Sequence, residues 1–233
     1  MFRARHAVAV LLVVAAASTF PSIAPIGAAD QTAPELAAAL QRKYDSVKDF
    51  SADFTHTYQG GVLRKKITER GHLVVKKPGK MRWEYSVPEP KQFVSDGMKM
   101  YSYIPQDKQV IVASVPPENE ATTPALFLTG KGDIARDFIA TYAETAPAGA
   151  PAMPPGTTSL KLTPRRSEPE YEYLVVAIDP VTFQIRALTT RDRQGGDSTL
   201  TFTNLKENQG ISDKEFAFRV PRGVDVITDG TRN

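Results

Sequence analysis

Residues 71–105 have the sequence GHLVVKKPGKMRWEYSVPEPKQFVSDGMKMYSYIP. Within this stretch Met81, Trp83 and Tyr85 alternate with two charged residues, which is the period of a strand with one buried face. The Pro-Gly pair at 78–79 favours a tight turn, because proline presets φ and glycine accepts a positive φ. The stretch therefore predicts short antiparallel strands with aromatic side chains gathered on one face.

The same two-residue period extends in both directions along the chain. Phe50, Ala52 and Phe54 alternate with polar residues, and a Gly-Gly pair at 60–61 follows them. Besides 81–85, we expect strands at 62–68, 71–77, 92–95, 99–104, 109–113, 158–163, 171–178, 183–192 and 198–204, with a short end strand in the tail 213–227. Regular spacing and few helices favour a mainly β fold, a single antiparallel sheet that is strongly curved or barrel-like.

One amphipathic helix is predicted before the first strand. Thr32 and Glu35 have the spacing of a capping box, and Pro34 is tolerated in a first helical turn. Apolar residues then recur at near-helical spacing: Leu36, Leu40, Tyr44 and Val47. We expect this apolar face to lie on the sheet.

A segment between the strands breaks the two-residue period. Residues 114–132 hold three prolines and the apolar cluster Ala-Leu-Phe-Leu at 125–128, and Asp133 is a candidate cap for a further short helix. Short apolar helices at this point would be either plugs on the core or a lid over an opening. Farther on, the Pro/Ala/Gly-rich loop 146–156 is interpreted as a surface excursion within one domain.

The first 29 residues have the features of a cleaved secretory signal. Arg3 and Arg5 precede the apolar run 7–17, and small residues occupy 27–29. An uncleaved membrane anchor is the alternative, but prolines at 21 and 25 interrupt a span that would need about 20 apolar residues. Cleavage removes both arginines and no acid, so the net charge falls from +3 to +1 and demands no nucleic-acid partner. Residues 30–233 are then expected to form a single domain.

Composition gives little support for catalysis. The chain has no cysteine, which excludes disulfides and a lipid-modified N-terminal cysteine. His56 and His72 lack a partner at the spacing of metal ligands, and no serine lies in a Gly-x-Ser-x-Gly elbow. We therefore expect no enzyme activity, no catalytic residues, no metal site and no cofactor.

The aromatic residues of 71–105 could form either a solid core or the wall of a cavity. A curved sheet with a helical cover can hold a ligand on its covered side, and the separate apolar cluster at 125–128 suits such a cover. We therefore predict an apolar binding surface lined by Met81, Trp83, Tyr85, Phe93, Met100, Tyr101, Tyr103, Leu126, Phe127 and Leu128.

Three blocks of sequence resemble the LolA family of periplasmic lipoprotein carriers. They are G-x-L-V-V-K-K-P-x-K-x-R-W-E-Y at 71–85, V-S-D-G at 94–97 with Y-x-Y-x-P at 101–105, and F-x-F-x-x-P-x-G-V-x-V at 216–226. They occur in order over the mature chain. The resemblance implies an incomplete antiparallel barrel, half-open, with an N-terminal helix and short helices as a lid over its concave hydrophobic face.

The resemblance also implies a function and partners. Members accept acylated lipoproteins from the inner-membrane LolCDE ABC transporter, shield the acyl chains in the cavity and deliver them to the outer-membrane receptor LolB. The protein would then be a monomeric carrier of the periplasm. The alternative is a periplasmic regulatory or sensor module that binds a lipid or a protein partner on the same half-barrel.

One residue of the family pattern differs in this chain. The basic residue before the proline of K-K-P, commonly arginine in the family, is implied to bond to the backbone of the lid and hold it closed. Lys77 occupies that position, and it offers a point charge rather than a planar fork of donors. We therefore expect Lys77 to be the lid latch, with Arg82 or Arg64 as substitutes; the loop 146–156 also departs from the family pattern.

Overall fold

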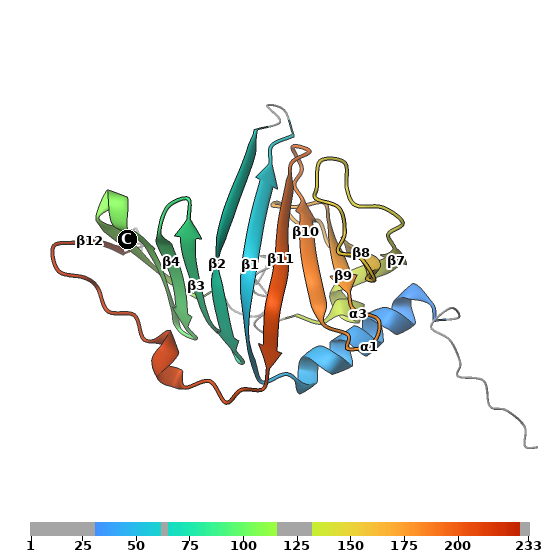
Figure 1. The fold of residues 1–233 in the computed structure, drawn as a ribbon, viewed down its shortest axis with the longest axis horizontal. Helices are drawn as coiled ribbons and strands as arrows, with labels where there is room; N and C mark the ends of the chain where they lie inside the picture. Colours follow the sequence, from blue (N-terminus) through green and yellow to red (C-terminus); the bar gives the residue numbers. More distant parts are fainter. Residues whose placement is uncertain (1–30, 62–64, 116–131, 229–233) are drawn as a thin grey trace, which may run out of the picture. The chain divides into compact units, whose positions relative to one another are not determined.

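The computed structural model describes residues 31–61, 65–115 and 132–228. Its strands form one twelve-stranded sheet in the order β12-β6-β5-β4-β3-β2-β1-β11-β10-β9-β8-β7. β12 and β7 are the two ends of this sheet and do not pair with each other, so the sheet is open (Figure 1). The predicted fold class, mainly β with an incompletely closed antiparallel sheet and few helices, is confirmed.

The elements follow one another in a meander. The helices are α1 (Ala33–Ser46) and α3 (Ile134–Asp137), with short 3-10 turns η2 (Pro105–Asp107) and η4 (Asp213–Phe216). The strands are β1 (Asp49–Gln59), β2 (Lys66–Lys76), β3 (Lys80–Val87), β4 (Lys91–Asp96), β5 (Lys99–Ile104), β6 (Gln109–Ser114), β7 (Phe138–Tyr142), β8 (Thr158–Pro164), β9 (Tyr173–Ile178), β10 (Ile185–Arg191), β11 (Asp197–Glu207) and β12 (Asp225–Thr228).

α1 begins and packs as its sequence predicts. The carboxylate of Glu35 accepts hydrogen bonds from the backbone N–H and the hydroxyl of Thr32, both at 2.8 Å. Leu36, Leu40 and Tyr44 are buried in the core together with residues of β1. In Figure 1 the helix lies beside the half of the sheet formed by β7 to β11, away from β3 to β6.

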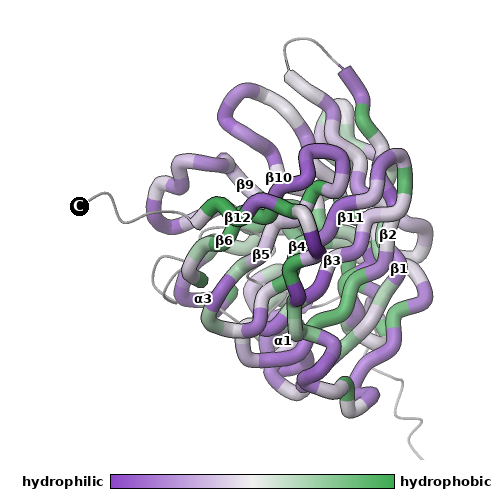
Figure 2. The backbone as a smooth tube through the Cα atoms, turned by 90° about the vertical axis from the view of Figure 1, so that its left-hand side faces the viewer, coloured by the Kyte–Doolittle hydropathy of each residue, from purple (hydrophilic) through white to green (hydrophobic). Residues whose placement is uncertain are grey.

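We call the sheet face that carries Phe50, Ala52 and Phe54 of β1 the inner face, and the opposite face the outer face. The main core lies on the inner face, where α1 packs. Hydrophobic and hydrophilic stretches alternate along the strands (Figure 2), as expected for a sheet whose neighbouring residues point to opposite faces.

The structure has a single strand, β2, where two strands were expected. Strands at 62–68 and 71–77 were expected, but β2 runs without a break from Lys66 to Lys76, and residues 62–64 lie outside the described part of the chain. The expected gap at 69–70 is bridged because β2 pairs with β1 residue by residue from Lys66 to Lys76. Beside this point the pairing with β3 shifts by one residue: Arg70 pairs with Val87 and Gly71 with Tyr85, so β3 carries the extra residue.

Two other elements also differ from the expectation. Asp133 caps the short helix α3, as predicted, by accepting from Arg136 N at 2.7 Å, whereas the strand β7, which begins at Phe138, was not predicted. β12 pairs with β6 in parallel rather than antiparallel. The segment before β12 ends beside the start of β6, where Asp225 N donates to Lys108 O at 2.9 Å. Both strands therefore begin at the same edge of the sheet and run in the same direction.

Position 71 must be glycine because neighbouring groups approach its Cα too closely to leave room for a side chain. It lies opposite Phe54 on one side and Tyr85 on the other. A Cβ atom here would be 2.0 Å from the carbonyl oxygen of Glu84 and 2.8 Å from Cζ of Phe54. The missing side chain therefore makes room for the ring of Phe54 on the inner face.

Replacing this glycine should destabilise the fold. We expect Gly71→Ala to lower the free energy of unfolding by about 2 kcal/mol, because overpacking a filled site moves backbone and rings. Gly60→Ala is the matched control, since the nearest atom to its Cβ would be 3.8 Å away, and it should change stability by less than about 0.5 kcal/mol. Urea denaturation measures both, and equal stability of the two variants would contradict the prediction.

Candidate functional site

Four aromatic rings form a continuous row on the inner face across β1, β3 and β4. Phe54 contacts Trp83 and Tyr85 edge to face, with ring centroids 5.0 and 4.9 Å apart, and Tyr85 contacts Phe93 at 5.7 Å. Such pairs stabilise by about 0.5–1.5 kcal/mol each beyond their buried area. We call Phe54, Trp83, Tyr85 and Phe93 the aromatic row.

The exposure of this face increases from β3 toward β12. Met81 and Trp83 are core residues, and Trp83 Nε1 lies 3.4 Å from the sulfur of Met81. Phe93 and Met100 are half-buried at the margin of the core. On β6, Ile111 pairs with Ser102, the neighbour of Phe93, so it lies on the same face, and it is 45% exposed.

The apolar surface continues to the edge of the sheet. Ile227 of β12 pairs with Ile111 and is 44% exposed. An apolar surface that is buried at one end and accessible at the other can accept a long apolar ligand without a change of the core.

Two residues predicted for this surface lie elsewhere. Tyr101 and Tyr103 alternate with Met100 and Ser102 on β5, so they point to the outer face, opposite to Trp83 and Phe93. There Phe218 stacks on Tyr101 with ring centroids 5.1 Å apart and lies 6.1 Å from Tyr103. The prediction that they share one surface with the other residues is therefore wrong. Leu126, Phe127 and Leu128 lie outside the described residues.

A C-terminal segment, residues 208–221, covers the outer face; we call it the strap. The buried carboxylate of Asp49 accepts hydrogen bonds from the backbone N–H groups of residues 209, 210 and 211, at 2.6, 3.1 and 3.3 Å. Lys76 and Lys80 pair with Asp213 at 2.6 and 2.9 Å, and their hydrogen bonds lower the pKa of Asp213 to about 2.

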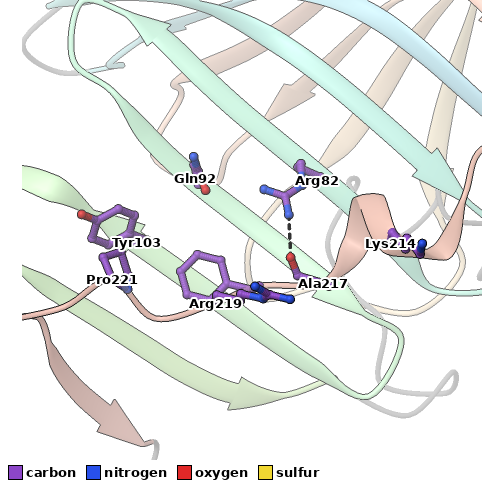
Figure 3. Close-up of a pocket in the computed structure, with 8 residues that line it drawn as sticks. Arg82, Gln92, Tyr103, Lys214, Ala217, Arg219 and Pro221 are labelled. Atoms are coloured by element: carbon purple, nitrogen blue, oxygen red, sulfur yellow. Dashed lines mark hydrogen bonds between the residues drawn. The ribbon is translucent and has the colours of Figure 1, made fainter.

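Arg82 completes these anchors. Its guanidinium donates to the carbonyl oxygens of Glu215 and Ala217 at 2.5 and 3.0 Å, and Figure 3 shows the bond to Ala217. An open hollow of about 680 Å³ lies beside it, lined by Arg82, Gln92, Tyr103, Lys214, Ala217, Phe218, Arg219 and Pro221. The guanidinium of Arg82 therefore binds the strap to the outer face.

Lys77 is bound to the end of α1. Its ammonium donates to the carbonyl oxygen of Tyr44 and lies 4.8 Å from the centroid of the Tyr44 ring. Burial lowers the pKa of Lys77, although the charges of Asp45 and Glu207 oppose this effect. A cation at a helix C-terminus is favoured by the helix dipole. The lid residues 126–128, which Lys77 was expected to contact, lie outside the described residues, and so does Arg64.

Sequence reasoning missed a charged cluster at the margin of the aromatic row. The carboxylate of Glu69 accepts from Lys91 Nζ at 2.6 Å and lies 3.2 Å from His56 Nδ1, while His56 Nε2 is 2.9 Å from the hydroxyl of Ser198. The Lys91 ammonium lies 4.3 Å from the centroid of the Tyr85 ring. The residues come from four strands, so only the pairing register brings them together.

The electrostatics of this cluster follow from its half-burial. Burial would by itself raise the pKa of Glu69, but hydrogen bonds from Lys91 and His56 outweigh it and lower the pKa. Burial, helped by the charge of Glu69, raises the pKa of Tyr85. Glu69 is therefore ionised and Tyr85 neutral at neutral pH.

The described part of the chain offers few sites for other chemistry. Within it no group of three or more histidine or acidic side chains could hold a metal ion. Of the helices in that same part, none has the length and apolar character needed to cross a membrane.

Comparison with known proteins gives one consistent result. The sequence pattern of the family described as "Outer membrane lipoprotein carrier protein LolA" matches residues 45–219. A protein of Chromohalobacter salexigens named "Outer-membrane lipoprotein carrier protein" is 32% identical over 88% of this chain and 92% of its own length. One of Hahella chejuensis with the same name is 30% identical over 89% of this chain and 96% of its own.

Among solved structures, an uncharacterized conserved protein from Thermus thermophilus has a similar fold. Its TM-score is 0.52 at 12% identity, covering 85% of this chain and 99% of that chain. At this identity the likeness concerns the fold alone.

The contact between Lys77 and α1 can be tested by substitution. We expect Lys77→Met to lower the free energy of unfolding by about 1 kcal/mol, because the charged hydrogen bond to Tyr44 O is lost in a half-buried place. Lys77→Arg should restore most of it, and Lys48→Met, at an exposed lysine nearby, should change little. Thermal unfolding measures all three; a stability loss as large for Lys48→Met would exclude a specific role.

Proposed function

The chain belongs to the LolA family of outer membrane lipoprotein carrier proteins, and from this premise we propose that it is a periplasmic carrier that shields the acyl chains of lipoproteins on its inner face. The observation that carries the proposal is the apolar surface extending from the buried Trp83 through the half-buried Phe93 to the exposed Ile111 and Ile227.

The energetics suit a carrier that must also release its cargo. Each acyl CH₂ group withdrawn from water contributes about 0.8 kcal/mol, so even one long chain is held firmly once it is covered. A surface that is only partly covered withdraws fewer of these groups than a closed pocket does. Cargo can then pass onward to a receptor that covers the chains more completely.

The finer parts of the proposal concern export, the partners that supply and receive the lipoproteins, and the cover over the bound chains. Residues 1–29 direct export and are removed, and residues 30–233 act as one domain. The protein accepts lipoproteins from the LolCDE transporter and delivers them to LolB. Leu126, Phe127 and Leu128 cover the bound chains, and Lys77 helps to hold this cover closed. The protein acts as a monomer and performs no catalysis.

The direct test is release of lipoproteins from spheroplasts that contain the cognate transporter. The mature protein should release outer-membrane-type lipoproteins into soluble complexes with itself. If the transporter is intact and the lipoproteins stay in the membrane, the carrier function is wrong. Capture of a non-acylated single-pass membrane protein instead would favour a regulatory module.

A charge placed on the apolar surface should block binding. Trp83→Glu is unsuitable, because Trp83 is only 5% exposed and a buried charge would disrupt the core. Phe93→Glu changes the half-buried margin and should reduce binding of a hydrophobic dye about tenfold or more, because a carboxylate must then be desolvated beside the ligand. Val181→Glu, at a residue 84% exposed in the turn between β9 and β10, is the control. Equal dye binding by both variants would remove Phe93 from the site.

A further inference from the structure

We propose that the inner face also binds free long-chain fatty acids, with the carboxylate on the ammonium group of Lys91 and the chain across β4, β5, β6 and β12. This inference rests on the proposed function, because it uses the same apolar surface, and it adds a second class of ligand. It gives a role to a lysine at the margin of that surface, which the shielding of acyl chains alone does not require.

The ammonium group of Lys91 has donors to spare on the inner face. Such a group has three N–H donors, and within the described residues it has one hydrogen-bond acceptor, Glu69 Oε1 at 2.6 Å. The ammonium lies 4.3 Å from the centroid of the Tyr85 ring and 5.9 Å from that of Phe93. A head group whose chain begins at Phe93 therefore meets the remaining donors.

The charges around Lys91 attract an anionic head. A carboxylate oxygen in a second hydrogen-bond direction lies about 2.8 Å from Nζ and, at a tetrahedral angle, about 4.4 Å from the Glu69 oxygen. The nearer attraction exceeds the farther repulsion. His56, the other partner of Glu69, adds either no charge or a positive one. Glu89, in the preceding turn, is exposed to water, and the described ion pair of Lys91 is with Glu69, so the charge of Glu89 is screened.

The marginal position of Lys91 keeps the cost of binding a charge small. Its side chain is 24% exposed, so water still reaches a head bound there. A carboxylate at this margin keeps part of its hydration, whereas a carboxylate in the core would lose it. Hydrogen bonds between two charged groups are about twice as strong as neutral ones. A fatty acid should therefore bind more tightly than a neutral ester of the same chain.

An accessible apolar path for the chain starts beside Lys91. Phe93 lies two residues from Lys91 on the same face, about 7 Å along β4. From Phe93 the pairing partners on successive strands are Ser102, Ile111 and Ile227. Phe93 is half-buried, and the two isoleucines are 45% and 44% exposed. We call these four residues the strip.

The strip has the length of one acyl chain. Neighbouring strands lie about 4.8 Å apart, so the strip extends about 14 Å from Phe93 to Ile227. One acyl chain spans half of the hydrocarbon core of a bilayer, about 15 Å. The small side chain of Ser102 leaves room for the chain between Phe93 and Ile111. Trp83 stays in the core, so the chain binds to residues that are already accessible.

The first test compares laurate with monolaurin at pH 8, below their micelle-forming concentrations, by isothermal titration calorimetry. Both carry a twelve-carbon acyl chain, but laurate is a carboxylate and monolaurin is a neutral ester. The mature protein should bind laurate about tenfold more tightly, because its head makes a charge-assisted hydrogen bond. Equal affinities, or tighter binding of monolaurin, would contradict the site for the head.

Substitutions of the charged pair provide the second arm. Lys91→Met should lower the affinity for laurate about tenfold and that for monolaurin less than about threefold, because only laurate loses an opposite charge. Glu69→Gln should raise the affinity for laurate about threefold, because one repulsion is removed. Lys161→Met is the matched control. Lys161 lies 4.1 Å from the centroid of Tyr173 and alternates on β8 with inner-face core residues, so it points to the outer face.

Two neighbouring residues of β12 test the path of the chain. Ile227→Asn should lower the affinity for laurate about fivefold, because apolar contact area is lost at the end of the strip. Val226→Asn is the matched control. Val226 is 51% exposed, but it pairs with Val110 on the outer face, so its substitution should leave the affinity unchanged. Circular dichroism confirms that each variant is folded.

The outcomes separate this inference from the proposed function. If the wild-type protein binds neither laurate nor monolaurin, the proposed function fails and the fatty-acid site fails with it. If it binds both but Lys91→Met behaves as Lys161→Met does, the site for the head is wrong. If Val226→Asn weakens binding as much as Ile227→Asn, the path of the chain is wrong. In these last two cases the proposed function stands.

Discussion

The strap and its anchors determine which face of the sheet a ligand can reach. Side chains alternate across β3 to β6, so apolar groups such as Val94 and Val110 lie on the outer face while Phe93 lies on the inner face. The outer groups are covered by the chain's own C-terminal segment, which Asp49, Lys76, Lys80 and Arg82 hold. The strap covers these groups and leaves an open hollow beside Arg82 on the outer face, whereas the exposed apolar residues Ile111 and Ile227 lie on the inner face of the same strands.

Local patterns predicted much of this fold. The capping residues of α1, the period of β3 and the open, mainly antiparallel sheet all follow from side-chain periodicity and turn chemistry, which act over a few residues. The predictions were wrong where contacts between distant chain segments determine the course of a strand. β2 is continuous across 69–70 because it pairs with β1 along its whole length, and β12 pairs in parallel because the strap brings it to the start of β6.

The candidate site likewise contains residues that the local sequence pattern could assign and residues that it could not. Met81, Trp83 and Tyr85 could be assigned to one face from the period alone, whereas Tyr101 and Tyr103 required the register of β5 and the position of Phe218. The cluster of His56, Glu69 and Lys91 could not be foreseen, because the three pairings β1–β2, β2–β3 and β3–β4 create it. This charged cluster gives the aromatic row a polar margin beside Tyr85.

The proposed role of the inner face is to hold the acyl chains of lipoproteins. Native mass spectrometry of the protein, purified from the periplasm without detergent, is the decisive test, because it identifies the bound molecule without a prior choice of ligand. We predict complexes with acylated proteins, and hydrolysis of their acyl groups should abolish these complexes. A protein that emerges bound only to a partner without acyl groups would contradict this role.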